Sequence, residues 1–142
     1  MALLLRLACL SCLISTLSFA ESVSGWLVNS KCFSSIERNR GDIPSYVNWD
    51  INGAIRYCSP TKKTTSFAVV SKNDGLPYRF DAAGNEKAIG LGLNANKKSA
   101  YLVKVDGVTS RKNGVISRNT ITVQAIAILT RVNRNGRGAP GL

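Results

Sequence analysis

A hairpin pattern near the middle of the chain constrains the fold more than any other feature of this sequence. Residues 66–71 (SFAVVS) form a short, nearly continuous apolar run, which is typical of a strand covered on both faces. Asp74-Gly75 follows, and an Asp-Gly step supplies the positive φ that a tight hairpin needs. Every second residue of 76–81 is then apolar, which predicts a half-buried return strand, with Pro77 at an edge or near the strand start.

Three further segments have strand patterns. Residues 25–29 (GWLVN) are short and apolar, and residues 99–106 carry apolar side chains on one face until Asp106-Gly107, where we expect the strand to end. Residues 119–128 alternate until Ile126, where the phase shifts. That shift predicts a bulge or a strand end that is buried on both faces.

The connections between these strands are longer. Residues 30–65 predict a helical connection that enters at Ile43-Pro44-Ser45 and stops at Ser59-Pro60, with Cys58 on its buried face. Residues 82–85 have the composition of a turn, and 86–95 fit a short helix or a covering loop equally well. Residues 111–114 (RKNG) predict a hairpin-type turn. The fold class is therefore all-β with one or two short helices.

The first twenty residues, MALLLRLACLSCLISTLSFA, contain one charge and end with small residues at the −3 and −1 positions of a signal-peptidase cut. They predict a secretory signal peptide that is removed after Ala20. The alternative is a membrane anchor, but Ser and Thr residues interrupt the run, and a span needs roughly 20 apolar residues. A lipid-modified Cys9 or Cys12 is disfavoured by its flanking residues.

This leader divides the chain into three parts. We expect a signal peptide at 1–20, one domain at 21–130 and a disordered basic tail at 131–142. The mature chain has no transmembrane span by this interpretation, and its location is secreted or periplasmic. Cys32 and Cys58 are then the cysteines of the mature chain, in an oxidising compartment, and they predict a disulfide. A redox-active pair is the alternative, but such pairs usually have Cys-x-x-Cys spacing.

Catalysis and metal binding find little support. The chain has no His, so His-dependent triads and His-ligated zinc sites are excluded. Its eight carboxylates are scattered, and adjacent Ser and Lys residues on a strand point to opposite faces. We therefore expect a protein that is not an enzyme, with no cofactor and no metal site.

The order of predicted strands matches a five-stranded OB-type barrel, in which a helix-like segment lies between the third and fourth strands. Several motifs add to this match: Gly25-Trp26-Leu27-Val28 with a Cys six residues after the Trp, a second Cys before the strand at Phe67, VKVDGV at 103–108 and NTITV at 119–123. Together, over residues 24–128, they resemble the small exported OB-fold-like domains of bacteria. The segment between the cysteines and the loop before Asn119 are longer here. The resemblance implies a fold and export, and no activity.

The charge of the chain indicates an anionic partner. Residues 1–20 contain one Arg and no acid, so their removal changes the net charge from +11 to +10. OB barrels bind ligands across the second and third strands, between the loops that join strands one and two and strands four and five. The residues predicted to form this ligand-binding face are Lys62, Lys63, Tyr78, Arg79, Arg111, Lys112 and Arg118.

A basic face of this kind suits an anionic polymer or the anionic cell envelope. Nucleic acid is not favoured, because single-strand platforms use several stacking aromatics and most aromatics here fall at core positions. Trp26 is expected to plug the barrel, and Trp49 is the aromatic expected to be exposed. The alternative is that these cations have no specific ligand and form an ordinary solvated surface. A different hypothesis is a structural accessory subunit that binds a protein partner by an exposed strand edge.

Overall fold

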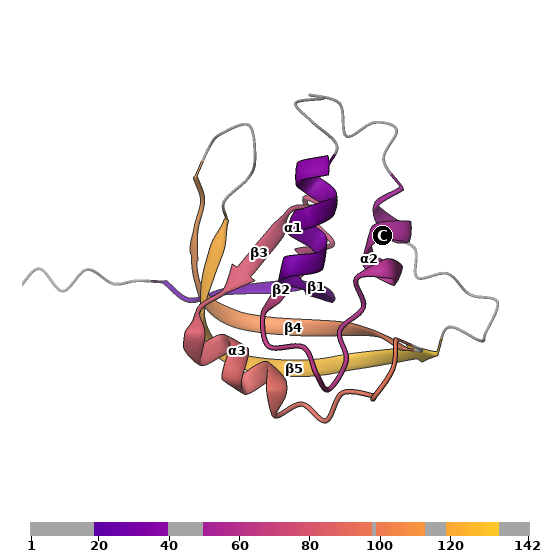
Figure 1. Ribbon diagram of the computed structural model, residues 1–142. Helices are drawn as coiled ribbons and strands as arrows, with labels where there is room; N and C mark the ends of the chain where they lie inside the picture. Colours follow the sequence, from indigo (N-terminus) through magenta and orange to yellow (C-terminus); the bar gives the residue numbers. More distant parts are fainter. Residues whose placement is uncertain (1–18, 40–49, 98, 113–118, 134–142) are drawn as a thin grey trace, which may run out of the picture.

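The computed structural model describes residues 19–39, 50–97, 99–112 and 119–133 (Figure 1). Five strands in this part of the chain close into a ring in the order β1-β2-β3-β5-β4. The elements are β1 (Glu21–Asn29), α1 (Ser30–Asn39), α2 (Ile51–Tyr57), β2 (Phe67–Ser71), β3 (Pro77–Phe80), α3 (Ala82–Ile89), β4 (Ser99–Ser110) and β5 (Thr120–Asn133). The prediction of a mostly β fold with five strands is confirmed.

The ring is held by four antiparallel pairings and one parallel pairing. β1 lies between β2 and β4, β2 pairs with β3, and β4 pairs with β5 along its whole length. The parallel contact between β3 and β5 is short, since it joins Arg79 to Thr120 and Phe80 to Ile121. No helix in the described part of the chain is long and apolar enough to cross a membrane.

The predicted hairpin at the centre of the chain is confirmed. Gly75 has φ +69°, and its N–H donates to the Ser71 carbonyl at 2.9 Å. Asp74 stabilises the same turn by accepting the Leu76 N–H at 3.0 Å. Pro77 is the first residue of β3, where its missing N–H is tolerated.

Two cores lie on opposite faces of the sheet. Inside the ring, Phe67 and Val69 pack with inward residues of the other strands and with Ala88 of α3. Outside it, Ala68 and Val70 pack beneath α1 and α2, which lie together on one side of the sheet (Figure 1). All five residues of β2 are buried, so the prediction of a strand covered on both faces is confirmed.

Trp26 belongs to the outer core. It is 4% exposed and packs with the residues under α1 and α2, so it does not plug the ring interior. The expectation that Trp26 is a core residue is right, and its expected location inside the barrel is wrong. The reason is strand alternation, because Leu27, its neighbour, takes the inward position.

Helix α1 is an element that the sequence interpretation did not specify. The side chain of Asn29 accepts the N–H groups of Lys31 at 3.1 Å and Cys32 at 3.2 Å, which satisfies two otherwise unpaired donors at the helix start. Phe33 is buried on the inner side of the helix. Cys32 forms the predicted disulfide with Cys58, which joins α1 to the end of α2.

The predicted helix before Cys58 is confirmed as α2, which begins at Ile51 after an Asp50 cap. The expected entry at 43–45 and Trp49 lie outside the described residues, as does the predicted signal peptide up to residue 18.

Residues 82–85 are the first turn of α3 and not an isolated turn, so that expectation is wrong. The Asp81 carboxylate accepts the Gly84 N–H at 3.1 Å and the Val123 N–H at 3.0 Å. It therefore caps the helix and fixes it to β5 at once. A Cβ at Gly84 would lie 2.5 Å from the Val123 side chain, which explains glycine in this helix. The open choice for 86–95 is settled as helix to Ile89, followed by a turn at 90–91 and irregular structure.

The last two strands are longer than expected. β4 continues through Gly107 to Ser110, so Gly107 does not mark the end of the strand. A Cβ at this position would lie 2.2 Å from the Thr122 carbonyl oxygen, so the glycine lets β5 come close to β4. β5 continues to Asn133, so the expected tail at 131–142 is wrong for its first three residues, and 134–142 lie outside the description. Of the two alternatives for the phase shift at Ile126, the bulge is confirmed, since the register between β4 and β5 shifts at Asp106/Gly107 and β5 does not end there.

Candidate functional site

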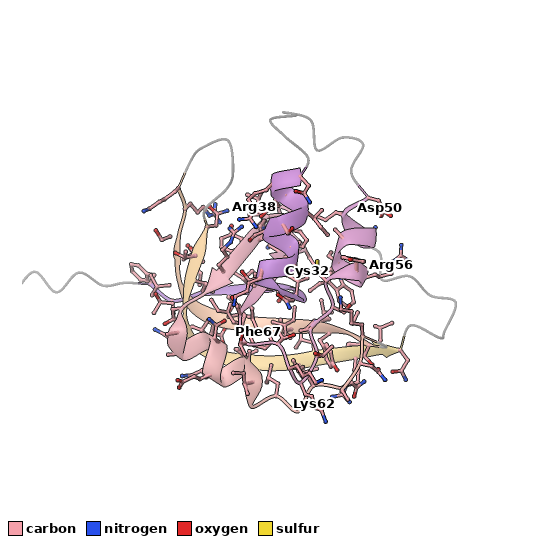
Figure 2. All side chains as sticks on the ribbon, viewed as in Figure 1. Cys32, Arg38, Asp50, Arg56, Lys62 and Phe67 are labelled. Atoms are coloured by element: carbon pink, nitrogen blue, oxygen red, sulfur yellow. A yellow bond between two sulfur atoms is a disulfide. The ribbon has the colours of Figure 1, made fainter. Side chains whose placement is uncertain are left out.

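The two loops predicted to carry the ligand lie at opposite ends of β4. Lys62 donates its backbone N–H to the Asn94 carbonyl at 2.9 Å, which places it beside the loop before β4. Arg111 and Lys112 follow the other end of the strand, and a 12-residue strand spans up to about 40 Å. Lys62 lies low in the view of Figure 2, whereas the end of β4 and the start of β5 lie at the upper left of the same view in Figure 1.

Lys62 and Lys63 are therefore not brought together with Arg111 and Lys112, whereas Tyr78 and Arg111 are neighbours. Arg118 lies outside the described residues. The physical reason is the content of the connection between β1 and β2. That connection forms α1 and α2, which cover the outer face of the sheet, and its last part is hydrogen-bonded to the loop before β4.

Tyr78 is buried and does not present a stacking surface. It is 1% exposed, its hydroxyl donates to Asp74 at 2.7 Å, and the Arg111 guanidinium lies 5.7 Å from its ring centroid. Burial, with a smaller contribution from the Asp74 carboxylate, raises the pKa of the Tyr78 hydroxyl to about 12. Tyr78 thus holds the β2–β3 turn and the end of β4 together.

The Arg79 side chain contacts two residues of α1. Its guanidinium lies 2.7 Å from the Glu37 carboxylate and donates to the Ser34 hydroxyl at 2.9 Å. Burial raises the pKa of the Glu37 carboxyl, and the Arg79 charge opposes that rise without cancelling it. The side chain predicted to face a polyanion therefore fastens the helical cover to β3.

A pocket of about 390 Å³ lies beside Tyr78, between the start of β1 and the β2–β3 turn. Glu21, Asp74 and Arg111 carry its charges. The Glu21 carboxylate accepts the Thr109 hydroxyl at 2.7 Å, and Asp74 accepts that of Tyr78. Two carboxylates against one guanidinium make this pocket unsuited to an anionic polymer.

Four cationic residues lie elsewhere, on segments that meet at the loop around Asn94. We call this group the basic corner and define it by Lys62, Lys63, Lys97 and Arg131. The Arg131 guanidinium donates to the Asn94 side chain at 3.4 Å and to the Gly92 carbonyl at 3.2 Å, while Lys62 donates its N–H to the Asn94 carbonyl. Lys97 follows three residues later and donates to the Tyr57 carbonyl at 2.8 Å.

The segments that form the basic corner contain no acid. Neither 58–66 nor 90–97 has an Asp or Glu, and the chain has none after Asp106. All four cationic residues are exposed. Arg131 also lies 5.2 Å from the ring centroid of Tyr101, so its guanidinium is supported from below by a buried aromatic. The corner therefore combines two cations held by side-chain contacts, Lys97 and Arg131, with two exposed lysines on the neighbouring segment.

Lys97 and Arg131 were missed from the sequence as site residues. Arg131 was assigned to the tail, although the apolar positions Ile126, Ile128 and Val132 already indicate a strand that continues past it. No group of three or more His, Cys, Asp or Glu that could hold a metal occurs in the described ranges. Comparison with known protein families, curated proteins and solved structures found no match.

Proposed function

We propose that the chain is an exported domain of OB-like architecture that acts by binding an anionic polymer at the basic corner. The order of strands in the ring supports the OB-like assignment, as does the position of α3 between β3 and β4. The disulfide supports an oxidising compartment, and hence a secreted or periplasmic location after removal of residues 1–20.

One observation carries the binding proposal: cationic residues come from three segments that are far apart in the sequence, meet at the loop around Asn94 and contain no acid near these cations. Lys62 and Lys63 come from the α2–β2 connection, Lys97 from the loop before β4, and Arg131 from β5. Such an arrangement concentrates positive potential at one place, and a polyanion gains affinity by releasing its counterions there.

The outer face of β2 is a poor alternative for the ligand. Ala68 and Val70 are buried beneath α1 and α2, which are joined by the disulfide. A ligand on that face would have to displace the outer core. We therefore place the ligand at the basic corner, which the helical cover leaves exposed.

The test separates the arrangement of charge from its total. One variant neutralises the basic corner (Lys62→Gln, Lys63→Gln, Lys97→Gln, Arg131→Gln). The matched control neutralises four exposed lysines elsewhere (Lys31→Gln, Lys72→Gln, Lys87→Gln, Lys112→Gln), so both variants lose four charges. Affinity for a heparin oligosaccharide is measured by titration calorimetry at fixed salt, with thermal unfolding as a check on folding.

The first variant should lose at least tenfold more affinity than the control. Equal losses in the two variants would show that total charge alone attracts the polymer, and the proposal of a site would fail.

A second candidate function is a structural accessory subunit that binds a protein partner by a strand edge. The observation that favours it is β5, which pairs with β3 only at Thr120 and Ile121, so its other side beyond Ile121 pairs with no described strand. Residues 121–130 (ITVQAIAILT) contain no charge and no Pro, two of the devices that protect an edge. A partner captured from envelope extracts that survives high salt, and is lost with Ala127→Lys, would support this alternative.

A further inference from the structure

Tyr57, the last residue of α2, is 65% exposed. The other aromatic residues described between Glu21 and Asn133 are buried, so Tyr57 is the exposed aromatic of this part of the chain. Exposure of one aromatic carries no function by itself. The position of Tyr57 next to the basic corner, however, indicates a role in binding.

Two contacts fix Tyr57 to the corner. The Lys97 ammonium lies 4.9 Å from the centroid of the ring and also donates to the Tyr57 carbonyl at 2.8 Å. Five residues along the chain, Lys62 is hydrogen-bonded to Asn94. Both ends of segment 57–62 therefore lie against the same loop, 94–97, and the ring borders Lys97, one of the four cations of the corner.

From this geometry we infer that the anionic polymer is an acidic polysaccharide and that Tyr57 stacks on one of its sugar rings. The inference rests on the proposed function. Lys97 lies over one face of the ring, and 65% of the residue is exposed, so the ring is accessible to a ligand. A pyranose ring offers a matching flat face of C–H groups, with its carboxylate or sulfate groups at the rim, where the cations can reach them.

The same geometry disfavours other polyanions. Polyphosphate has no ring to stack, so it would gain nothing from Tyr57. Single-stranded nucleic acid is usually held by several stacking aromatics along a groove, and the described part of the domain exposes one. A single ring beside four cations fits one sugar of an acidic chain whose neighbouring sugars contact Lys62, Lys63 and Arg131.

The experiment compares three probes of similar charge: a heparin hexasaccharide, inorganic polyphosphate and a single-stranded oligothymidylate. Tyr57→Ala removes the ring and Tyr57→Phe retains it, and both leave every cation in place. Affinities are measured by titration calorimetry on the mature chain. Tyr57→Ala should weaken the hexasaccharide about tenfold, which is the scale of one aromatic stack, and should change polyphosphate by less than twofold. Tyr57→Phe should stay within about threefold of the natural chain for each probe.

The outcomes separate the inference from the function on which it rests. If the natural chain binds hexasaccharide and polyphosphate but Tyr57→Ala weakens neither, or weakens both equally, the stacking inference is overturned and the proposed function stands. If oligothymidylate binds more tightly than the hexasaccharide and depends on Tyr57, the ligand class is overturned in favour of nucleic acid. If none of the probes binds, the proposed function itself fails.

Discussion

The Glu37 carboxylate on α1 lies 2.7 Å from the Arg79 guanidinium on β3, and this ion pair fastens the helical cover to the ring. Burial leaves the pKa of the Glu37 carboxyl raised in the folded chain. A group with a raised folded pKa contributes stability that is complete below its unfolded pKa and is lost as pH rises through the folded value.

We therefore predict that the natural chain gains stability relative to Glu37→Gln as the pH falls from 7 towards 4.5. Urea unfolding of both proteins at a series of pH values measures this difference. Glu86→Gln, which removes the same charge from the exposed side of α3, is the matched control. A natural chain that loses stability relative to Glu37→Gln in acid would mean that Arg79 outweighs burial at this carboxyl.

A second prediction concerns alkaline pH and the Tyr78 hydroxyl. Because the pKa of this hydroxyl is raised to about 12, its contribution to stability is present below pH 10 and is lost as the pH rises from 10 through 12. Tyr78→Phe should cost about 1 kcal/mol near pH 8, through loss of the hydrogen bond to Asp74. That deficit should shrink above pH 10 in guanidinium unfolding experiments. A deficit that stays constant to pH 12 would contradict the assignment.

The disulfide should contribute strongly to stability. Cys32 and Cys58 are 26 residues apart, and a loop of this length corresponds to about 3 kcal/mol in the chain-entropy description. Cys32→Ala with Cys58→Ala should therefore lose about that amount in denaturant unfolding. The intact mass of the natural chain, exported and then purified, should be two hydrogens below that of the reduced chain. Free thiols in that material would argue against the pairing or against export.

Gly107, where β4 comes close to β5, should not accept a side chain. A Cβ there would lie 2.2 Å from the Thr122 carbonyl oxygen, so Gly107→Ala should destabilise the chain by about 2 kcal/mol or more. Gly90→Ala is the control, because its Cβ would lie 3.4 Å from the nearest backbone oxygen and its φ of −71° suits alanine. That control should change stability by less than about 1 kcal/mol. Similar losses in the two variants would contradict the close approach of β4 and β5.

The sequence was sufficient for the existence of the five strands and for the disulfide, but not for the ends of β4 and β5. The run at 66–71 and the Asp74-Gly75 step are local signals, and the structure has a doubly covered β2 and a turn with φ +69° at Gly75. Gly107 shows the limit of this reasoning. An Asp-Gly step predicts a turn from local geometry, but here the glycine serves a contact with β5, which no local pattern records.

The helices and the site depended on packing. Residues 82–85 have the composition of a turn, and nothing in the sequence indicated that they begin α3. The Asp81 carboxylate that caps this helix also accepts the N–H of Val123, which is 42 residues away, and a local pattern does not record such a contact. Arg79 was predicted to face a ligand because Glu37 was not known to lie beside it. Lys62 and Arg131 are both hydrogen-bonded to Asn94, Lys62 through its backbone N–H and Arg131 through its guanidinium. The sequence could not predict that these two residues are neighbours, because this depends on the path of the α2–β2 connection.

The salt dependence of heparin binding tests the central claim most directly. Each cation that contacts the polymer releases roughly one counterion, contributing about 0.7–0.9 to the slope of log K against log salt. The variant that neutralises Lys62, Lys63, Lys97 and Arg131 should therefore lower the slope by about three, while the variant that neutralises Lys31, Lys72, Lys87 and Lys112 should leave it within about one of the natural value. Equal slopes for the two variants, or a natural chain whose affinity is independent of salt, would contradict binding at the basic corner.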